Sequence, residues 1–163
     1  FHGLEVDIRP DGSLALSEKG LDLLDFAIVS VHSSFRLSKP AMTKRIIRAL
    51  NHKKVKIFGH PTGRKINHRE GYELDWEQIF PICLKNKIAL EINAYPERLD
   101  LPDHLVREAV KHGVKIVIST DSHSLEQMSL MKYGVDVARR GWAEKGDVLN
   151  TLPYGKISQW LSF

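Results

Sequence analysis

The sequence of 163 residues lacks the features that stabilise secreted proteins or anchor a chain in a membrane. It has a single cysteine, Cys83, so a disulfide framework is excluded and a reducing compartment is expected. No apolar run approaches the roughly 20 residues that cross a bilayer, and no signal peptide is recognisable. We therefore predict a cytoplasmic protein with no membrane partner.

An excess of one charge is also missing, because 24 Lys and Arg residues stand against 20 Asp and Glu residues, a formal net charge of +4. Such a small excess is compatible with a phosphorylated or nucleic-acid substrate, and equally with an ordinary solvated surface. The length and composition are those of a single globular domain with a sizeable core. The partners must therefore be inferred from motifs rather than from charge.

Short apolar runs alternate with helix-like segments along the chain. The strand-like runs cover 4–8, 26–31, 55–58, 88–92 and 114–118. Strands that alternate with helices are typical of βα units and a parallel sheet. A closed eight-fold barrel takes about 250 residues, and five strands are too few to close one. The expected fold class is α/β, either an open sheet or the later part of a barrel whose first strands are missing.

Two of the helical segments carry features that a structure can test. The segment at 38–50 has one apolar face, and its other face, with Arg45 and Arg48, is expected in solvent. The segment at 75–86 contains Pro81, which should kink or break the helix. Shorter helical pieces are expected at 125–131, 135–140, 145–149 and 157–161.

Polar side chains that bind metal ions stand where the strand-like runs end. They are Glu5 inside the first run, and His32, His60, Asn93, Asp121 and His123 just after later runs. A lone imidazole at such a place is usually a hydrogen-bonded loop residue. Repeated at the ends of several strands, these groups would be desolvated without partners unless a cation sat among them. The pattern therefore predicts a metal site, and imidazole with carboxylate favours Zn, Mn or Fe.

A ligand cluster large enough for more than one ion suggests hydrolysis of a phosphate ester, since two cations can activate water and hold the reacting oxygens in line. A ligand that bridges two ions should be a carboxylate, and Glu5 is best placed. Asp7 would point to the same side of its strand, and we assign it to solvent. We assign Asn93, with the loop residues Arg64 and Arg98, to substrate binding. Arginine offers forked donors to phosphate, although lone loop arginines are more often surface charge.

Five short motifs contain these residues: Gly3-Leu4-Glu5-Val6-Asp7-Ile8, Val31-His32-Ser33, Gly59-His60-Pro61, Glu91-Ile92-Asn93-Ala94 and Thr120-Asp121-Ser122-His123. Together they resemble the motifs of the PHP (polymerase and histidinol phosphatase) superfamily. Longer strings resemble one branch, the C-terminal PHP domain of bacterial and archaeal family X DNA polymerases. These strings are His60-Pro61-Thr62-Gly63-Arg64, 90–94 with 98–101, and 137–142 with 147–151.

The resemblance implies a distorted, TIM-like (βα)7 barrel with up to three Mn²⁺ or Zn²⁺ ions at its C-terminal rim. By similarity, Glu5 would bridge two metals and Asp121 would bind the first. His32 and His60 would bind the second metal, and His123 the third. No further catalytic residue is assigned. In that family the domain is linked to phosphoesterase activity, including 3′-5′ exonuclease and end-processing activity on DNA, beside a polymerase core that acts in DNA repair.

The sequence departs from the family pattern at its start. The family begins the domain with a His-x-His after its first strand, and His2-Gly3-Leu4 is not that motif. We therefore expect residues 1–163 to be a single, partial PHP domain whose first and third metal sites lack ligands. An incomplete barrel would leave an open sheet edge, which invites pairing with a second copy of the chain.

Three functions remain open on the sequence. The first is a metal-dependent phosphoesterase domain of a family X DNA polymerase, with DNA as substrate. The second is a catalytically inactive PHP scaffold that binds DNA or a partner protein. The third is a free-standing PHP phosphatase that acts on a small phosphate ester.

Overall fold

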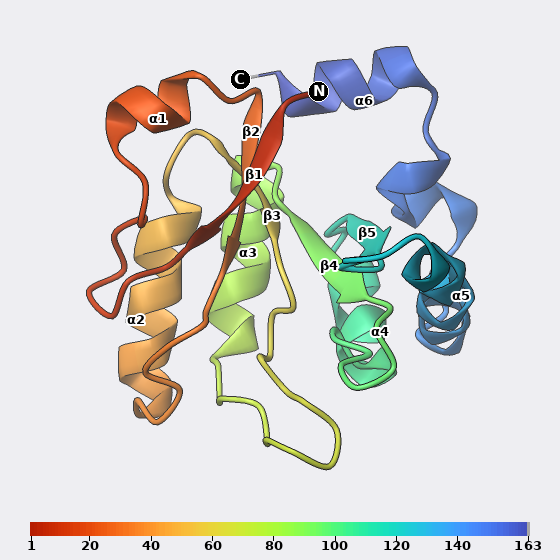
Figure 1. The fold of residues 1–163 in the computed structure, drawn as a ribbon, viewed down its shortest axis with the longest axis horizontal. Helices are drawn as coiled ribbons and strands as arrows, with labels where there is room; N and C mark the ends of the chain where they lie inside the picture. Colours follow the sequence, from red (N-terminus) through yellow and green to blue (C-terminus); the bar gives the residue numbers. More distant parts are fainter. Residues whose placement is uncertain (163) are drawn as a thin grey trace.

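The computed structural model describes residues 1–162 as one open sheet with helices packed around it (Figure 1). The five strands are all parallel, and their spatial order is the order of the chain. They are β1 (Gly3–Asp7), β2 (Phe26–Ser30), β3 (Val55–Phe58), β4 (Ala89–Asn93) and β5 (Ile116–Ser119). The predicted α/β class and parallel sheet are confirmed. Closure into a barrel stays a prediction, because β1 and β5 form the two edges of this sheet.

Helices connect the strands and continue after the last one. They are α1 (Glu18–Asp22), α2 (Lys39–Leu50), α3 (Trp76–Asn86), α4 (Asp103–Lys111), α5 (Met131–Arg140) and α6 (Tyr154–Leu161). Short 3₁₀ turns lie at η1 (Glu126–Leu130), η2 (Lys145–Asp147) and η3 (Leu149–Thr151). The pieces expected at 125–131 and 135–140 are in fact continuous, because η1 runs directly into α5. Among the described residues, no helix is long and apolar enough to cross a membrane.

Pro81 does not break its helix, as we had allowed, because α3 runs uninterrupted from Trp76 to Asn86. A proline withdraws one hydrogen bond, here the one that the carbonyl of Glu77 would accept. Glu77 is exposed and lies in the first turn, so water can take over that carbonyl. The position of the proline therefore makes its cost small.

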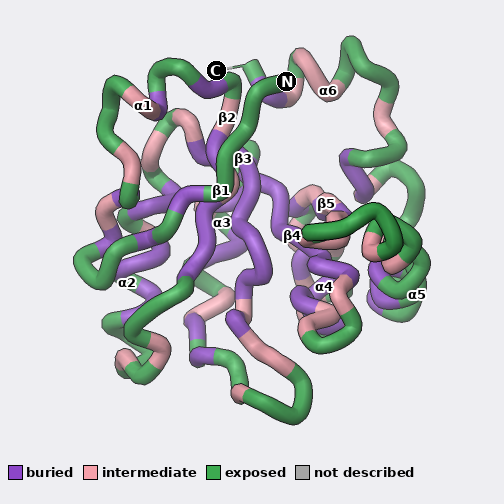
Figure 2. Tube along the Cα trace, viewed as in Figure 1, coloured by how far each residue is buried: buried purple, intermediate pink, exposed green. Residues whose placement is uncertain are grey.

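The sheet has one face in the core and one face that is partly open. Ala27 and Val29 of β2 and Phe58 of β3 are fully buried on the first face, against the helices. On the other face, Phe26 and Ile28 of β2 are only partly buried. Figure 2 shows the same contrast, with burial concentrated in the inner strands and exposure along β1. Polar residues follow the apolar ones at the ends of β2 and β4, at Ser30 and Asn93, and His60 follows β3, so a site can form there.

Arg45 of α2 is buried and not in solvent, which corrects the expectation for that helix face. Its guanidinium donates hydrogen bonds to the backbone carbonyls of Ile8, Arg9 and Ser33. The segments after β1 and β2 thus both attach to the same helix. Arg48, one turn further on, is exposed as expected. The periodicity of the helix alone cannot predict which of the two arginines is buried, because the loops that cover Arg45 come from distant parts of the chain.

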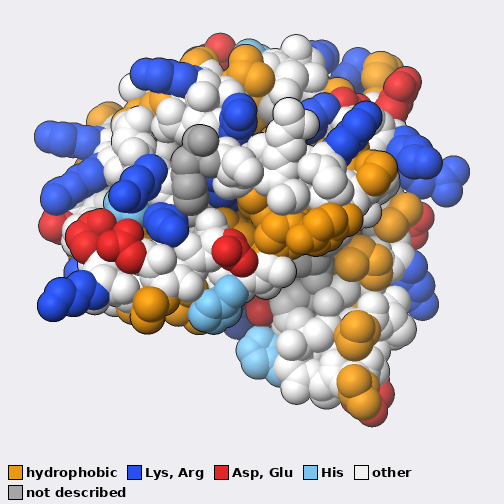
Figure 3. Space-filling view, turned by 90° about the horizontal axis from the view of Figure 1, so that it is seen from above, with side chains coloured by type: hydrophobic (Ala, Val, Ile, Leu, Met, Phe, Trp, Pro, Cys, Tyr) orange, Lys and Arg blue, Asp and Glu red, His pale blue; other side chains and the backbone are white. Residues whose placement is uncertain are grey.

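The end of the molecule that carries Phe1 and α6 is partly apolar. The rings of Phe1 and Tyr154 of α6 stack with centroids 5.3 Å apart, which ties α6 to the start of β1. Figure 3 looks onto this end and shows a band of hydrophobic side chains, with Lys and Arg side chains spread around its margin. The positive charge on this face is therefore scattered rather than arranged as a continuous stripe.

Candidate metal centre

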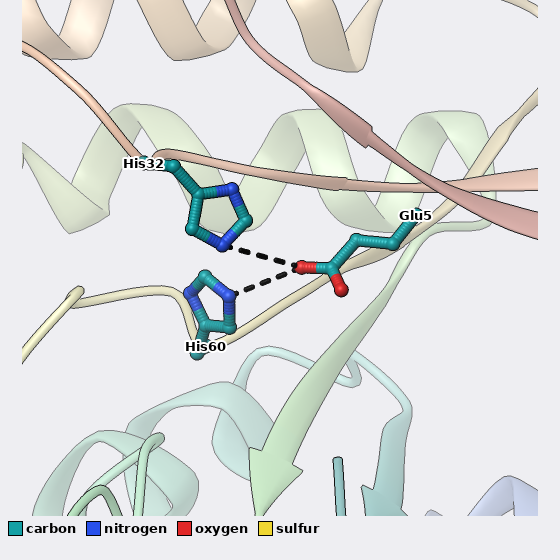
Figure 4. Close-up of side chains that lie close together, drawn as sticks. All are labelled: Glu5, His32 and His60. Atoms are coloured by element: carbon teal, nitrogen blue, oxygen red, sulfur yellow. Dashed lines mark hydrogen bonds and ion pairs between the residues drawn. The ribbon is translucent and has the colours of Figure 1, made fainter. Parts of the chain in front are cut away.

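Three of the side chains that the motifs single out converge on the partly open face of the sheet (Figure 4). Glu5 comes from β1, His32 follows β2 and His60 follows β3. The Nε2 atoms of His60 and His32 lie 3.1 and 3.7 Å from one carboxylate oxygen, Oε1 of Glu5. Within residues 1–162, this is the only group of three or more potential ligand residues whose ligand atoms all lie within 4.8 Å of one another. We call it the Glu–His–His triad.

Strand geometry explains why these three residues meet. The three strands are neighbours in a parallel sheet, so their carboxyl ends lie side by side at the same end of the sheet. Glu5 lies opposite Ile28, two residues before the end of β2, and its side chain reaches forward to the histidines. His32 and His60 then pack edge to face, with ring centroids 5.0 Å apart.

His32 is oriented by a second carboxylate. Its Nδ1 lies 2.5 Å from Oδ1 of Asp7, two residues after Glu5 on the same face of β1. A carboxylate at this position favours the tautomer with the proton on Nδ1, and it leaves the lone pair on Nε2, which faces Glu5. Asp7 is exposed, as predicted, and it has a second role that we did not predict. Its side chain is half-exposed, but it positions a triad residue.

His60 is fixed through its backbone as well as its ring. Its backbone N–H donates a 2.5 Å hydrogen bond to Oε2 of Glu91, and the hydroxyl of Ser119 donates to the other oxygen of that carboxylate. The residue is 2% exposed and has a φ of 28°, a left-handed conformation that needs such support. Its ring Nδ1 is buried and has no hydrogen-bond partner among the described residues.

The pKa values of the two glutamates of the site shift in opposite directions. The hydrogen bond with His60 is the main reason that the pKa of Glu5 falls from 4.5 to about 2, and a 2.6 Å bond from the Ser30 hydroxyl adds to it. Burial instead raises the pKa of Glu91 above its ordinary value. An ionised carboxylate therefore stands between the histidines, and a more readily protonated one lies behind His60.

This donor set fits a divalent cation. When Asp7 holds the proton on Nδ1, the Nε2 lone pair of His32 faces an anionic oxygen of Glu5, which is a repulsive contact. A cation among the three atoms would turn that repulsion into coordination. Two imidazole nitrogens and one carboxylate oxygen are ligands that Zn²⁺ and Mn²⁺ accept.

Asp121 and His123 follow β5 and do not join the triad. Oδ2 of Asp121 lies 3.2 Å from Nδ2 of Asn93 and 3.6 Å from Nε of Arg98. The ring Nδ1 of His123 lies 2.8 Å from the backbone carbonyl oxygen of Asp121. Both residues line a neighbouring pocket of about 210 Å³. Of the five predicted ligands, the structure brings three together and leaves two apart.

Comparison with known proteins identifies the family. Over 159 residues, 98% of its length, the chain is 45% identical to the DNA polymerase/3′-5′ exonuclease PolX of Bacillus subtilis. The chain belongs to the PHP superfamily. Within it, the chain is most like the C-terminal PHP domain of family X DNA polymerases, as its motifs indicate. No family model matches the sequence.

More distant relatives are named as probable phosphatases. A probable phosphatase of Clostridium acetobutylicum is 27% identical over 134 residues, and one of Caldicellulosiruptor saccharolyticus is 28% identical over 131 residues. Each match covers 76% of this chain. The chain spans 28% of the length of the polymerase and 52% of the length of each phosphatase.

Two residues that we assigned to substrate binding, Arg64 and Asn93, form hydrogen bonds within the chain. The guanidinium of Arg64 donates to the backbone carbonyls of Arg98 and Leu99, so it holds the loop after β4 in place. Asn93 is fully buried, and its side-chain oxygen accepts from the backbone N–H of Tyr95. In this structure Arg64 and Asn93 thus position their neighbours. Their assignment to substrate stays a prediction.

Sequence reasoning missed three residues that support the PHP triad: Asp7, Ser30 and Glu91. The signal for Asp7 was available, since residues two apart in a strand share a face. Ser30 lies two residues before His32 in the same way. Glu91 reads as an interruption of an apolar strand, and a buried carboxylate in such a place requires partners. Its partners, the backbone N–H of His60 and the hydroxyl of Ser119, come from other strands.

Proposed function

We propose that this chain is a metal-dependent phosphoesterase domain that acts on the 3′ end of DNA and works beside a family X DNA polymerase core in DNA repair. The observation that carries the proposal is the convergence of one ionised carboxylate and two imidazoles at the ends of three parallel strands. The composition of the triad favours Mn²⁺ or Zn²⁺ as the ion. The proposal includes a role in DNA repair. It also includes a location in the cytoplasm, where bacterial DNA is found.

Each triad residue has a role in this proposal. Glu5, His32 and His60 would hold the cation, with Asp7 orienting His32 and Glu91 holding His60. When bound, the cation supplies Lewis-acid activation of water and of a phosphoryl oxygen. The resemblance adds up to two further ions, with Asp121 and His123 as ligands.

DNA is favoured over a small phosphate ester by the extent of the two similarities. The match to the polymerase covers nearly the whole chain, whereas the matches to the phosphatases leave about a quarter of it unmatched. Nearly all of the chain therefore has a counterpart in a protein named for polymerase and 3′-5′ exonuclease activity. A small phosphate ester remains the second candidate substrate.

The test is hydrolysis by the purified full chain with Mn²⁺ or Zn²⁺, on 3′-ended duplex DNA and on p-nitrophenyl phosphate. We expect nucleotide release from DNA to exceed hydrolysis of the small ester. Glu5→Gln and His60→Ala should each abolish release, because each removes a triad ligand. Asp7→Asn should weaken metal affinity by about 10–100-fold, the usual effect of removing a carboxylate that orients a ligating histidine.

His104→Ala is the matched control, since His104 is an exposed histidine on α4. It should retain full activity and full metal content. Stoichiometric metal without hydrolysis of either substrate would favour the inactive scaffold instead. A chain that binds no divalent ion, or that keeps its activity in Glu5→Gln, would refute the proposal. Self-association through the free edge of β1 is a further prediction, which sedimentation of the same samples would check.

A further inference from the structure

A long loop, residues 59–75, joins β3 to α3 and extends past the other loops at the strand ends (Figure 1). Within it, the backbones of Lys65 and Arg69 pair as an antiparallel bridge, with both N–O distances 2.8 Å. We call residues 65–69 the hairpin, and the residues of its turn are exposed (Figure 2). Loops of this length are uncommon in compact domains and are often functional.

Two arginines hold the hairpin in place. The guanidinium of Arg69 donates to the carbonyl of Gly63 through Nε and Nη2, at 2.9 and 2.7 Å, and lies 3.7 Å from the centre of the Phe35 ring. The guanidinium of Arg64, just before the hairpin, donates to two backbone carbonyls of the loop after β4. The hairpin is therefore a fixed projection, and both arginines have partners within the protein.

Lys65 and Ile66, at the start of the hairpin, have side chains that the fold does not use in this way. Lys65 lines the pocket beside Asp121, and its ammonium has no hydrogen bond or ion pair among the described residues. Asp121 pairs instead with Arg98. Ile66 is 38% exposed, although its backbone N–H donates to the carbonyl of Glu97 at 2.6 Å. A free cation and an exposed apolar side chain thus stand side by side on an anchored backbone.

The hairpin lies close to the Glu–His–His triad along the chain. Its loop carries the triad residue His60, whose carbonyl accepts from the backbone N–H of Gly63 at 2.9 Å. Lys65 follows five residues after His60, so at most about 18 Å of chain separates them. About five stacked nucleotides of a DNA strand span the same distance. A strand that ends at the triad is therefore long enough to contact the hairpin.

We propose that the hairpin binds the DNA strand whose 3′ end lies at the triad: the ammonium of Lys65 pairs with a backbone phosphate, and Ile66 packs against an unpaired base near that end. The inference rests on the proposed phosphoesterase function, because it names substrate contacts of the same site. Lysine side chains commonly bind DNA phosphates, and apolar side chains pack against unstacked bases. Glu97 lines the same pocket as Lys65, so its carboxylate opposes the phosphate contact.

The test is binding of the full chain to a fluorescein-labelled DNA duplex with an unpaired 3′ end, measured by fluorescence anisotropy at several KCl concentrations with a chelator present. Lys65→Gln should weaken binding and reduce the slope of log K against log salt by about 0.7–0.9, the contribution of one phosphate contact. Lys65→Arg should retain the slope. Ile66→Ala should weaken binding about fivefold to tenfold at an unchanged slope, because it removes only apolar contacts. Glu97→Gln should strengthen binding.

Lys85→Gln and Leu84→Ala are the matched controls, because both residues are exposed in the last turn of α3, beside the start of β4 and away from the strand ends. Both controls should bind like the unaltered chain. Two results would overturn the inference: the same affinity and salt slope in the unaltered chain and Lys65→Gln, or no binding of this DNA by the unaltered chain at about 50 mM salt.

Hydrolysis does not enter this measurement, so the two proposals fail separately. A chain that binds DNA through the hairpin but releases no nucleotide when Mn²⁺ or Zn²⁺ is added would refute only the proposed function. A chain that releases nucleotides, and whose hairpin variants bind DNA unchanged, would refute only the role of the hairpin.

Discussion

At the scale of single residues, the site depends on carboxylates in different surroundings. Glu5 is half-exposed, carries hydrogen bonds and is ionised, whereas Glu91 is buried and its pKa is raised. The first suits a ligand, because a cation binds the deprotonated form. The second suits a structural role, since it accepts from the backbone of His60 and from Ser119. The same residue type thus serves two purposes according to burial.

The lowered pKa of Glu5 predicts how stability changes in acid. Because the folded state favours ionised Glu5, its contribution is present above the ordinary pKa of 4.5 and is lost as the pH falls toward about 2. Glu5→Gln lacks this contribution. In metal-free buffer the stability difference between the two chains should therefore shrink between pH 4.5 and pH 2.

Urea unfolding of both chains at several pH values, with a chelator present, measures this difference. Glu73→Gln is a suitable control, because Glu73 is an exposed glutamate in the loop before α3. A difference that stays constant across this range would mean that the hydrogen bonds to Glu5 do not stabilise its ionised form.

At the scale of elements, the fold depends on close contact between helices and strands. Gly134 of α5 is buried, and a Cβ there would lie 2.5 Å from Cγ2 of Ile118 and 2.9 Å from Cβ of Ala94. Both neighbours belong to the β4–β5 side of the sheet that carries Asn93 and Asp121. The contact between α5 and the sheet therefore helps to position the end of β5, after which Asp121 and His123 line their pocket.

Two glycine substitutions should have opposite effects on stability. Gly134→Ala should destabilise the chain by about 1–3 kcal/mol, because the added methyl group overfills a packed contact. Gly155→Ala, the same change in α6, meets nothing within 4 Å. It should stabilise the chain by about 0.5 kcal/mol, since alanine favours the helix over glycine.

Thermal and urea unfolding of both variants check this pair. Equal effects of the two substitutions would contradict the close packing of α5 on the sheet. Gly155→Ala should not change metal binding, because α6 contributes no residue to the triad.

At the scale of the whole molecule, a single hydrophobic core lies between the helices and the sheet and includes residues of all five strands. Cys83 of α3 is fully buried within it, beside the apolar residues of the inner strands. Burial raises the pKa of the Cys83 thiol to about 12. Since the thiolate is the reactive form, this cysteine reports whether the core as a whole is open.

We expect Cys83 to be unreactive toward a thiol reagent such as DTNB at pH 8 in the folded chain and to react fully in denaturant. The labelling rate should rise with urea in step with the loss of circular dichroism. Cys83→Ser provides the blank. Fast labelling while the circular dichroism is still native would show that α3 opens separately from the rest of the core.

The sequence by itself determined the order of strands and helices, the parallel sheet and the three triad residues, because hydrophobic period and strand-end position are local properties. It also indicated the PHP superfamily through motifs that cover most of the chain. Only the tertiary structure decided that Asp121 and His123 stand apart from the triad, that Arg64 holds a loop, and that Arg45 and Glu91 are buried. Each of these depends on a partner distant in the chain, and no local pattern specifies which carbonyl or carboxylate will lie beside a given side chain.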